Sequence, residues 1–411
     1  MPPSDLISVD ELRERILADI EPLPAYPQPL MDAFGLASAE DVHADVSLPS
    51  FDNSSHDGYA VHFADVASAT EESPVHLPVV GEIAAGQAGL LALSPGTAAK
   101  IMTGAPMPTG ADSVVPYEWT DRGVARVVIN QAPEDKGQHV RPIGDDVRSG
   151  DLVVSEGTIL GPRHLGLLAA VGRANVAVRP RPRVVILSTG SELRDPGQPL
   201  GHDSIYDGNS YLLAAAARRA GAIAYRVGIV PDEPAKFLEA LNDQLVRADL
   251  VITSGGVSQG DFDVVKEALR PQGVWFGGVA MQPGKPQGYG RVGEDRIPIF
   301  TLPGNPVSSY VSFHVFVLPA LRRIMGMRPE VRPLVRARLT HTISSRPGLR
   351  QFLRGDLVTT PGGPEVSPVG GAGSHLIGDL ANANCLMVIG EDTTSVEAGA
   401  SVDVLLLDEE F

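Results

Sequence analysis

The sequence predicts a multidomain protein of the α/β plus β class, in which a central three-layer parallel α/β domain is flanked by β-rich domains. Three observations support this. From residue 181 to 327, short β-branched strands alternate with helices, which is typical of a parallel sheet covered on both faces. Residues 48–147 carry short apolar runs split by Gly and Pro, which indicates β-hairpins. Residues 328–411 alternate polar with apolar residues, which predicts a small barrel-like β domain at the C-terminus.

The chain is expected to begin with a helix. Ser8 and Glu11 fit a capping box, and Leu12, Ile16 and Ile20 recur at helical spacing. A second helical stretch runs from residue 161 to 171 and leads into the Pro-rich joint VRPRPRV, which reads as a domain boundary. We therefore predict that residues 1–47 and 148–180 together form an N-terminal helical and linking domain.

The elements of the central domain follow one another at short intervals. Gly221 closes the first of its helices as a C-cap residue. The predicted strands cover residues 183–188, 222–230, 249–254, 273–281 and 297–303, and the predicted helices cover residues 210–221, 233–246, 263–270 and 307–325.

Composition excludes several classes of function. The net charge of −17 over 411 residues argues against nucleic acid as the main partner, because phosphate contacts need clustered Lys and Arg. No apolar stretch is long enough to span a bilayer, and the N-terminus lacks a signal core, so we expect a cytoplasmic protein without a membrane partner. A single cysteine, Cys385, cannot form an internal disulfide or a cysteine-rich zinc site.

Polar or Gly-rich loops follow five of the predicted strands. Each loop alone reads as an ordinary turn, but ligands of open α/β sheets bind beyond the carboxyl ends of the strands, so five such loops at one edge indicate a binding site. Their notable residues are Thr189, Gly190 and Glu192; Asp232; Gly255, Gly256, Ser258 and Asp263; Lys285; and Gly304, Asn305, Pro306 and Ser308.

These loops suit a phosphate-containing ligand. Gly-rich backbone and hydroxyl groups can donate to phosphate oxygens, and Lys285 can balance anionic charge. The carboxylates would repel a phosphate unless a cation lies between them, which implies Mg²⁺. SGGVSQG lacks the lysine of a Walker loop, and the dinucleotide fingerprint is absent.

The segment FDNSSHDGYAV, residues 51–61, places six polar side chains in a row before a glycine. An Asx or Ser turn explains such a run, because short polar side chains bind their own backbone. A functional loop is the alternative, and the segment alone leaves both readings open.

Seven motifs in order resemble the molybdopterin molybdenumtransferase family, which includes the E domain of gephyrin. They are FDNSSHDGYAV, KIMTGAPMPTGADSVVPYE, GQHVRPIGDDV, STGSEL, TSGGVSQGDFD, MQPGKP and LPGNPVSS. The resemblance implies an elongated four-part homodimer with a molybdopterin-binding α/β part. It also implies insertion of molybdate into adenylylated molybdopterin with release of AMP, and the molybdopterin adenylyltransferase as a further partner.

The resemblance also implies roles for individual residues. The DGYA loop would face the α/β site of the other subunit. By their motifs, Asp57, Thr103, Asp146, Lys285 and Arg354 would be catalytic, and the acidic strand-end residues Glu192, Asp232 and Asp263 would hold Mg²⁺. The remaining strand-end residues (Thr189, Gly190, Gly255, Gly256, Ser258, Gly304, Asn305, Pro306 and Ser308) would bind the cofactor. Gln282 stands where family members often carry lysine, which puts a two-lysine anion site in doubt.

The sequence leaves two alternative functions open. A molybdopterin adenylyltransferase uses the same α/β fold but would not need the N-terminal parts that carry DGYA and MTGAP. A scaffold module of the gephyrin type would not need the predicted site residues for catalysis.

Overall fold

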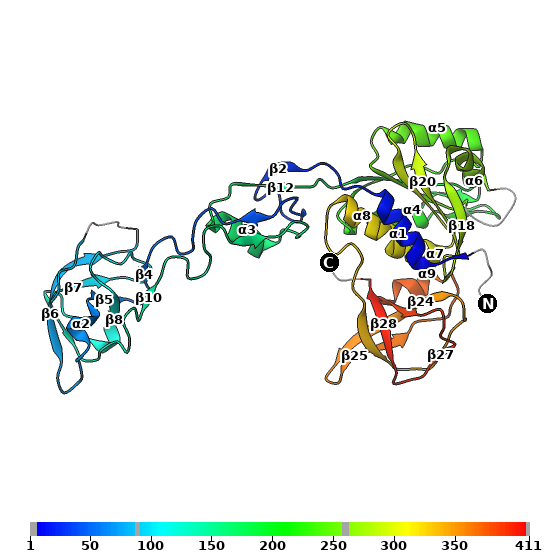
Figure 1. Ribbon diagram of the computed structural model, residues 1–411. Coiled ribbons are helices and arrows are strands. Elements are labelled where there is room, and N and C mark those ends of the chain that lie inside the picture. Colours follow the sequence, from blue (N-terminus) through cyan, green and yellow to red (C-terminus); the bar gives the residue numbers. More distant parts are fainter. Residues whose placement is uncertain (1–5, 87–90, 257–262, 408–411) are drawn as a thin grey trace.

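The computed structural model describes residues 6–86, 91–256 and 263–407 and shows an elongated molecule (Figure 1). A small β domain lies at one end. A narrow middle part joins it to the other end, where the α/β domain and the C-terminal β domain lie side by side. Within the described ranges, no helix is long and apolar enough to cross a membrane.

A seven-stranded sheet forms the centre of the α/β domain, in the order β1-β18-β20-β21-β17-β13-β16. The strands β13, β16, β17 and β21 run parallel, as the sequence predicts. β20 differs, because it runs antiparallel between β18 and β21. The strands cover Leu6–Ile7 (β1), Arg183–Ser188 (β13), Ile223–Arg226 (β16), Leu250–Ser254 (β17), Trp275–Val279 (β18), Pro286–Val292 (β20) and Ile297–Leu302 (β21).

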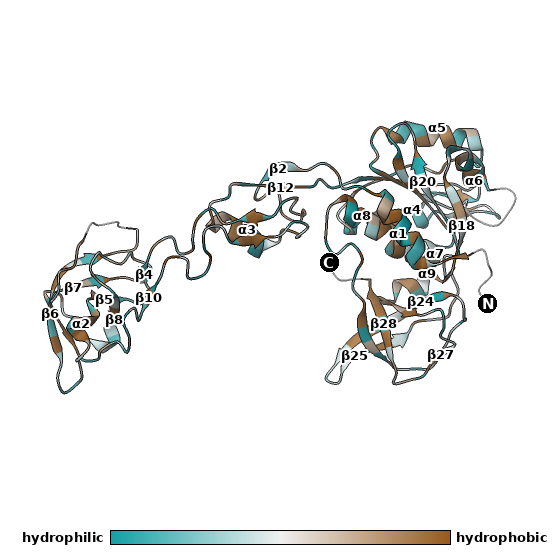
Figure 2. Ribbon diagram, viewed as in Figure 1, coloured by the Kyte–Doolittle hydropathy of each residue, from teal (hydrophilic) through white to brown (hydrophobic). Residues whose placement is uncertain are grey.

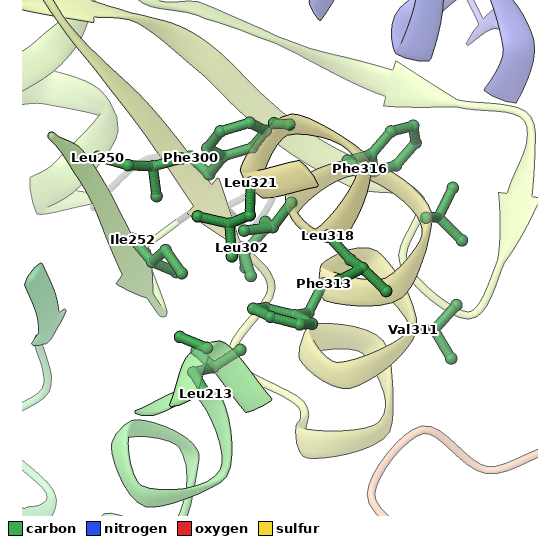
Figure 3. Packing of buried hydrophobic residues seen from close by; sticks show 14 of the residues in the cluster. Leu213, Leu250, Ile252, Phe300, Leu302, Val311, Phe313, Phe316, Leu318 and Leu321 are labelled. Carbon is green, nitrogen blue, oxygen red and sulfur yellow. The ribbon is translucent and has the colours of Figure 1, made fainter. Parts of the chain in front are cut away.

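Helices cover both faces of this sheet. α5 (Pro234–Leu245) and α6 (Val264–Leu269) pack on one face. On the other lie α4 (Asn209–Arg219) and a long helix formed by α7 (Pro306–Ser312), a π-helical turn (Phe313–Val317) and α8 (Leu318–Ile324). Figure 3 shows side chains of this core, in which Leu213 and Phe313 of the helices belong to the same buried cluster as Ile252 and Phe300 of the sheet.

The first helix, α1 (Val9–Asp19), begins as the capping signal predicts, with the Ser8 Oγ accepting from the Glu11 amide at 3.1 Å. Its Leu12 and Ile16 join the core of the α/β domain, and β1 pairs with β18. Along α1 the ribbon alternates between hydrophilic and hydrophobic segments (Figure 2), as expected for a helix with one buried face. We therefore propose to assign residues 6–23 to the α/β domain, although the sequence analysis grouped all of 1–47 with 148–180.

The β domain at the far end is built on a five-stranded sheet in the order β8-β5-β7-β6-β9. Two further strands, β4 (Asn53–Ser54) and β10 (Val140–Arg141), pair beside it, and α2 (Phe63–Val66) follows β5. The sheet strands cover Gly58–Val61 (β5), Val75–Ile83 (β6), Ala98–Ile101 (β7), Ser113–Pro116 (β8) and Arg126–Ile129 (β9).

The middle part consists of two strand pairs and one helix. β2 (Tyr26–Pro29) pairs with β12 (Asn175–Val178), and β3 (Val42–His43) pairs with β11 (Leu152–Val154). The helix α3 (Pro162–Ala170) packs its Leu165 and Leu168 into their small core.

The C-terminal domain is a small closed barrel, as the sequence predicts. Its ring runs β24-β25-β22-β28-β26 and closes through pairing of β26 with β24, while β19 (Met281–Gln282) attaches to β24. A short helix, α9 (Ile377–Ala381), lies between two of the strands in sequence. The ring strands cover Val335–Leu339 (β22), Arg350–Thr360 (β24), Gly363–Pro368 (β25), Cys385–Ile389 (β26) and Ser401–Leu406 (β28).

Candidate functional site

A cavity of about 220 Å³ lies at the carboxyl ends of β13 and β17 and beside the loop that follows β21. This is the edge of the sheet at which the strand-end loops were expected to meet. Below, we call it the strand-end pocket. Its lining residues are Ser188, Thr189, Glu192, Leu193, Ile205, Tyr206, Asp207, Gly208, Asn209, Ser254, Gly255, Gly304, Pro306 and Ile377.

Asn209 fixes the relative position of three elements around the strand-end pocket. Its Nδ2 donates to the Ser254 Oγ at 2.8 Å, at the end of β17, and to the Gly304 carbonyl at 2.6 Å, in the loop after β21. Since Asn209 is the first residue of α4, these two bonds hold the beginning of that helix against both strand ends.

Asp207 is a pocket residue that the sequence analysis missed. It is 2% exposed, and its Oδ1 accepts from the Ser210 amide at 3.0 Å and from the Ser188 Oγ at 3.3 Å. Its Oδ2 is buried and has no hydrogen-bond partner among the described residues. A buried carboxylate oxygen without a donor is costly, which makes Asp207 a candidate for a role in the pocket. The Asp-Gly-Asn run at the beginning of α4 is the sequence signal that could have identified it.

Several predicted cofactor-binding residues lie at the pocket. Thr189, Gly255, Gly304 and Pro306 line it directly. Gly255 has a φ of +93°, and an added Cβ would approach the Thr189 carbonyl oxygen to 3.1 Å, so the tight turn there requires glycine.

The other predicted cofactor-binding residues lie around it. The Asn305 Nδ2 donates to the Ser374 Oγ at 2.9 Å, which links the loop after β21 to the C-terminal domain. Ser308 is buried on α7, and Gly256 lies against Val265 of α6. Ser258 lies outside the described residues.

The three carboxylates expected to hold Mg²⁺ have separate local roles. The Asp232 carboxylate accepts from the Ser191 amide at 2.7 Å, and Asp263 caps α6 by accepting from the Lys266 amide at 3.3 Å. Glu192 lines the pocket next to Gly190. In the part of the chain that the structure describes, no group of three or more His, Cys, Asp or Glu could hold a metal ion. The described residues therefore do not fit a preformed three-carboxylate magnesium site.

Lys285 lies on the hairpin between β18 and β20, at the same edge of the sheet as the pocket but outside its lining. The Lys285 side chain is exposed, but hydrogen bonds hold the backbone of the turn that carries it. The buried Gln287 donates from Nε2 to the Gly284 carbonyl at 2.6 Å and to the Ser312 Oγ at 2.5 Å. Gln282, in the position where the family often has lysine, accepts from Gln351 of β24 at 2.8 Å. Its amide thus attaches the hairpin to the C-terminal barrel.

Arg354 is buried in β24. Its guanidinium donates to the carbonyls of Gly371 and Gly373, and burial lowers its pKa. The loop that it holds continues to Ser374, which bonds Asn305 next to the pocket. We propose that Arg354 is a positioning residue for that loop.

A second polar cluster lies in the β domain at the far end of the molecule. The Asp57 Oδ1 accepts from the Thr103 amide at 2.7 Å and from the Thr103 Oγ1 at 2.9 Å. These two bonds lower the pKa of Asp57 below its ordinary value, so the carboxylate is ionised at neutral pH. Both residues are exposed on the same end of the sheet, because Asp57 precedes β5 and Thr103 follows its antiparallel neighbour β7.

The polar residues before Asp57 form hydrogen bonds with backbone groups around them. The Asp52 Oδ1 accepts from the Ile143 amide, Ser54 bonds the backbone of His56, and Ser55 donates to the His139 carbonyl at 3.0 Å. The turn reading describes Ser54, whereas Asp52 and Ser55 bond residues 143 and 139 of a distant segment, and the Asp57 side chain bonds only Thr103 among the described residues. Gly58 is required because an added Cβ would come within 2.0 Å of a backbone oxygen of β8.

Asp146 is exposed in the segment between the β domain and the middle part. Its amide donates to the Leu48 carbonyl at 3.0 Å, and its side chain makes no hydrogen bond or ion pair within the described residues. The structure records no contact between Asp146 and either the strand-end pocket or the Asp57 cluster.

Within one chain, the Asp57 cluster and the strand-end pocket lie in the two end domains, with the middle part between them (Figure 1). The structure thus brings the predicted residues together in two groups rather than one. A site that uses both groups needs two copies of the chain.

Three family models match the chain in order. "MoeA N-terminal region (domain I and II)" matches residues 7–172, "Probable molybdopterin binding domain" matches residues 185–323, and "MoeA C-terminal region (domain IV)" matches residues 336–407. The middle model covers the strand-end pocket except Ile377, and the first covers the Asp57 cluster.

Curated relatives and solved structures agree with these models. The chain is 49% identical over 383 residues to Molybdopterin molybdenumtransferase 2 of Mycobacterium tuberculosis, covering 92% of this chain and 93% of that protein. Molybdopterin molybdenumtransferase 1 of the same organism is 42% identical over 423 residues, covering 97% and 99%. A crystal structure of the molybdopterin biosynthesis MoeA protein from Pyrococcus horikoshii is 31% identical, covers 98% of this chain and 99% of that one, and superposes with a TM-score of 0.83.

Proposed function

The chain belongs to the molybdopterin molybdenumtransferase family and is a transferase of molybdenum cofactor biosynthesis, and we propose that it inserts molybdate into adenylylated molybdopterin with release of AMP. The observation that carries this proposal is the strand-end pocket, which lies in the domain matched by the molybdopterin-binding model. Its hydroxyl groups and Gly-rich turns supply hydrogen-bond donors for phosphate oxygens.

We propose further that the protein is a homodimer with shared sites. Asp57 and Thr103 of one subunit would complete the strand-end pocket of the other. Support comes from the separation of the two groups in one chain and from the exposure of Asp57, whose side chain has no partner besides Thr103 among the described residues. In a shared site, the fixed carboxylate and the pocket donors would face the substrate from opposite sides.

An assay with purified protein, adenylylated molybdopterin and molybdate tests the proposed reaction. We expect release of AMP coupled to the formation of molybdenum cofactor that activates an apo-molybdoenzyme. With molybdopterin and ATP alone, we expect no adenylylated product. Adenylylation without molybdate insertion would instead identify an adenylyltransferase.

The magnesium requirement is a separate prediction. Mg²⁺ commonly binds through one or two carboxylates together with substrate phosphates, so the absence of a three-carboxylate cluster among the described residues is compatible with binding alongside the substrate. Activity should vanish in excess chelator and return when Mg²⁺ is restored. Undiminished turnover in the chelator would show that protein groups alone balance the charge of the substrate.

A further inference from the structure

The strand-end pocket lacks a basic side chain of its own. Its described lining includes two carboxylates, Glu192 and Asp207, and no Lys or Arg. The proposed substrate carries a pyrophosphate group and meets molybdate, and both are anions at neutral pH. Like charges oppose binding, so a basic group that reaches the pocket from the partner subunit would add to the charge balance that Mg²⁺ and Lys285 are proposed to supply.

The surface around Asp57 offers such a group. Strand register places Lys100 of β7 opposite Tyr59 of β5, and Val115 of β8 opposite Tyr59 on its other side. Cross-strand partners share a face of a sheet, so Lys100 projects from the same face as the buried Tyr59. The Tyr117 ring lies on this side too, with its centroid 5.5 Å from that of Tyr59 and 5.9 Å from the Lys100 Nζ. Asp57 lies close by, since burial and the nearby Asp57 charge raise the pKa of Tyr117. We call these four residues the Asp57 face.

Lys100 is only loosely held on this face. Its Nζ lies 3.8 Å from Glu82 Oε1 and 5.9 Å from the centre of the Tyr117 ring, and its side chain is 32% exposed. Glu82 is 58% exposed, and an ion pair in that setting contributes at most about 1 kcal/mol. The ammonium can therefore exchange Glu82 for a more strongly bound anion. The other cation on the Tyr117 ring, Arg122, is paired with Glu118 at 3.9 Å, and both of those side chains are largely exposed.

We propose that Lys100 is a substrate-binding residue that acts across the dimer. Its ammonium contacts a phosphate oxygen of adenylylated molybdopterin bound in the strand-end pocket of the partner subunit. This inference rests on the proposed shared site, because Lys100, like Asp57, lies in the β domain at the far end from the chain's own pocket. In this arrangement, the Lys100 ammonium balances part of the negative charge of the substrate, on the side opposite to the acidic pocket lining.

Kinetics of Lys100→Met test the contact. Loss of a charge-assisted hydrogen bond should raise KM for adenylylated molybdopterin roughly tenfold to a hundredfold, with a much smaller change in kcat. Lys100→Arg should recover part of the loss, because it keeps the charge. The control is Lys136→Met in the same domain, where Lys136 is 70% exposed and pairs with Asp112 at 3.3 Å. Wild-type KM in Lys100→Met, or an equal effect in the control, would overturn the proposal.

Subunit mixing separates this inference from the shared site itself. Lys100→Met mixed with the pocket variant Asp207→Asn should regain activity at limiting substrate, because one site of each heterodimer becomes wild type. Lys100→Met mixed with Asp57→Ala should not, since both changes lie on the Asp57 face. If Asp57→Ala and Asp207→Asn fail to complement each other, the shared site is wrong. If Asp57→Ala and Asp207→Asn complement each other, but Lys100→Met does not show the same complementation pattern as Asp57→Ala, only the role of Lys100 is wrong.

Discussion

Mixing Asp57→Ala subunits with Lys285→Ala subunits is expected to restore roughly a quarter to a half of wild-type activity, measured at limiting molybdate, where each variant alone is nearly inactive. In a shared-site homodimer, every site combines the Asp57 face of one subunit with the strand-end loops of the other. A mixed dimer then holds one doubly altered site and one intact site. Random exchange of equal amounts makes about half of the dimers mixed, which gives the lower value, and preferential pairing gives the higher one.

The two substituted residues suit this experiment because both are exposed. The Asp57 side chain bonds only Thr103 among the described residues, and the loop that carries Lys285 is fixed by Gln287. Activity and the mass of the mixed dimers would be measured together after subunit exchange. Mixed dimers without recovered activity would contradict the shared site. Equal recovery in a mixture of two Asp57→Ala preparations would reveal contamination rather than complementation.

Much of the fold was predictable because local signals agreed with the packing. The Ser8 cap starts α1 as expected, and the β-branched strands β13, β17 and β21 lie in one parallel group. Because the carboxyl ends of such strands share an edge, the pocket residues Thr189 and Gly304 could be anticipated from the sequence.

Other features depended on contacts between distant segments. The Gly-rich segment that forms β20 has no clear two-residue alternation, and its pairing with β18 and β21 makes it a strand. Periodicity predicts α1 but not the domain onto which its apolar face packs. Spacing along the chain also could not show that Asp232 and Asp263 bind nearby backbone amides instead of converging with Glu192.

Lys285 supplies a positive charge at the strand-end edge of the sheet, and its proposed role depends on this charge as well as on its position. Lys285 is exposed and makes no ion pair with any described residue, while its backbone carbonyl accepts from the Val279 amide at 2.7 Å. Its side-chain stem passes Gly278 of β18, where an added Cβ would lie 3.6 Å from the Lys285 Cε. A free ammonium on so rigid a hairpin suits an oxyanion such as molybdate or a phosphate.

Lys285→Ala should therefore leave the free energy of unfolding nearly unchanged while raising the molybdate concentration needed for half-maximal insertion roughly tenfold to a hundredfold. Lys285→Arg should restore only part of this, since a planar guanidinium does not reproduce a compact ammonium on the same stem. Urea unfolding and insertion kinetics at limiting molybdate measure the two effects. Lys236→Ala is the matched control, because Lys236 is an exposed lysine of α5 already paired with Glu233 at 2.6 Å. Wild-type molybdate dependence in both Lys285 variants would remove this residue from the site, whereas a loss confined to them would place the oxyanion at the β18–β20 hairpin.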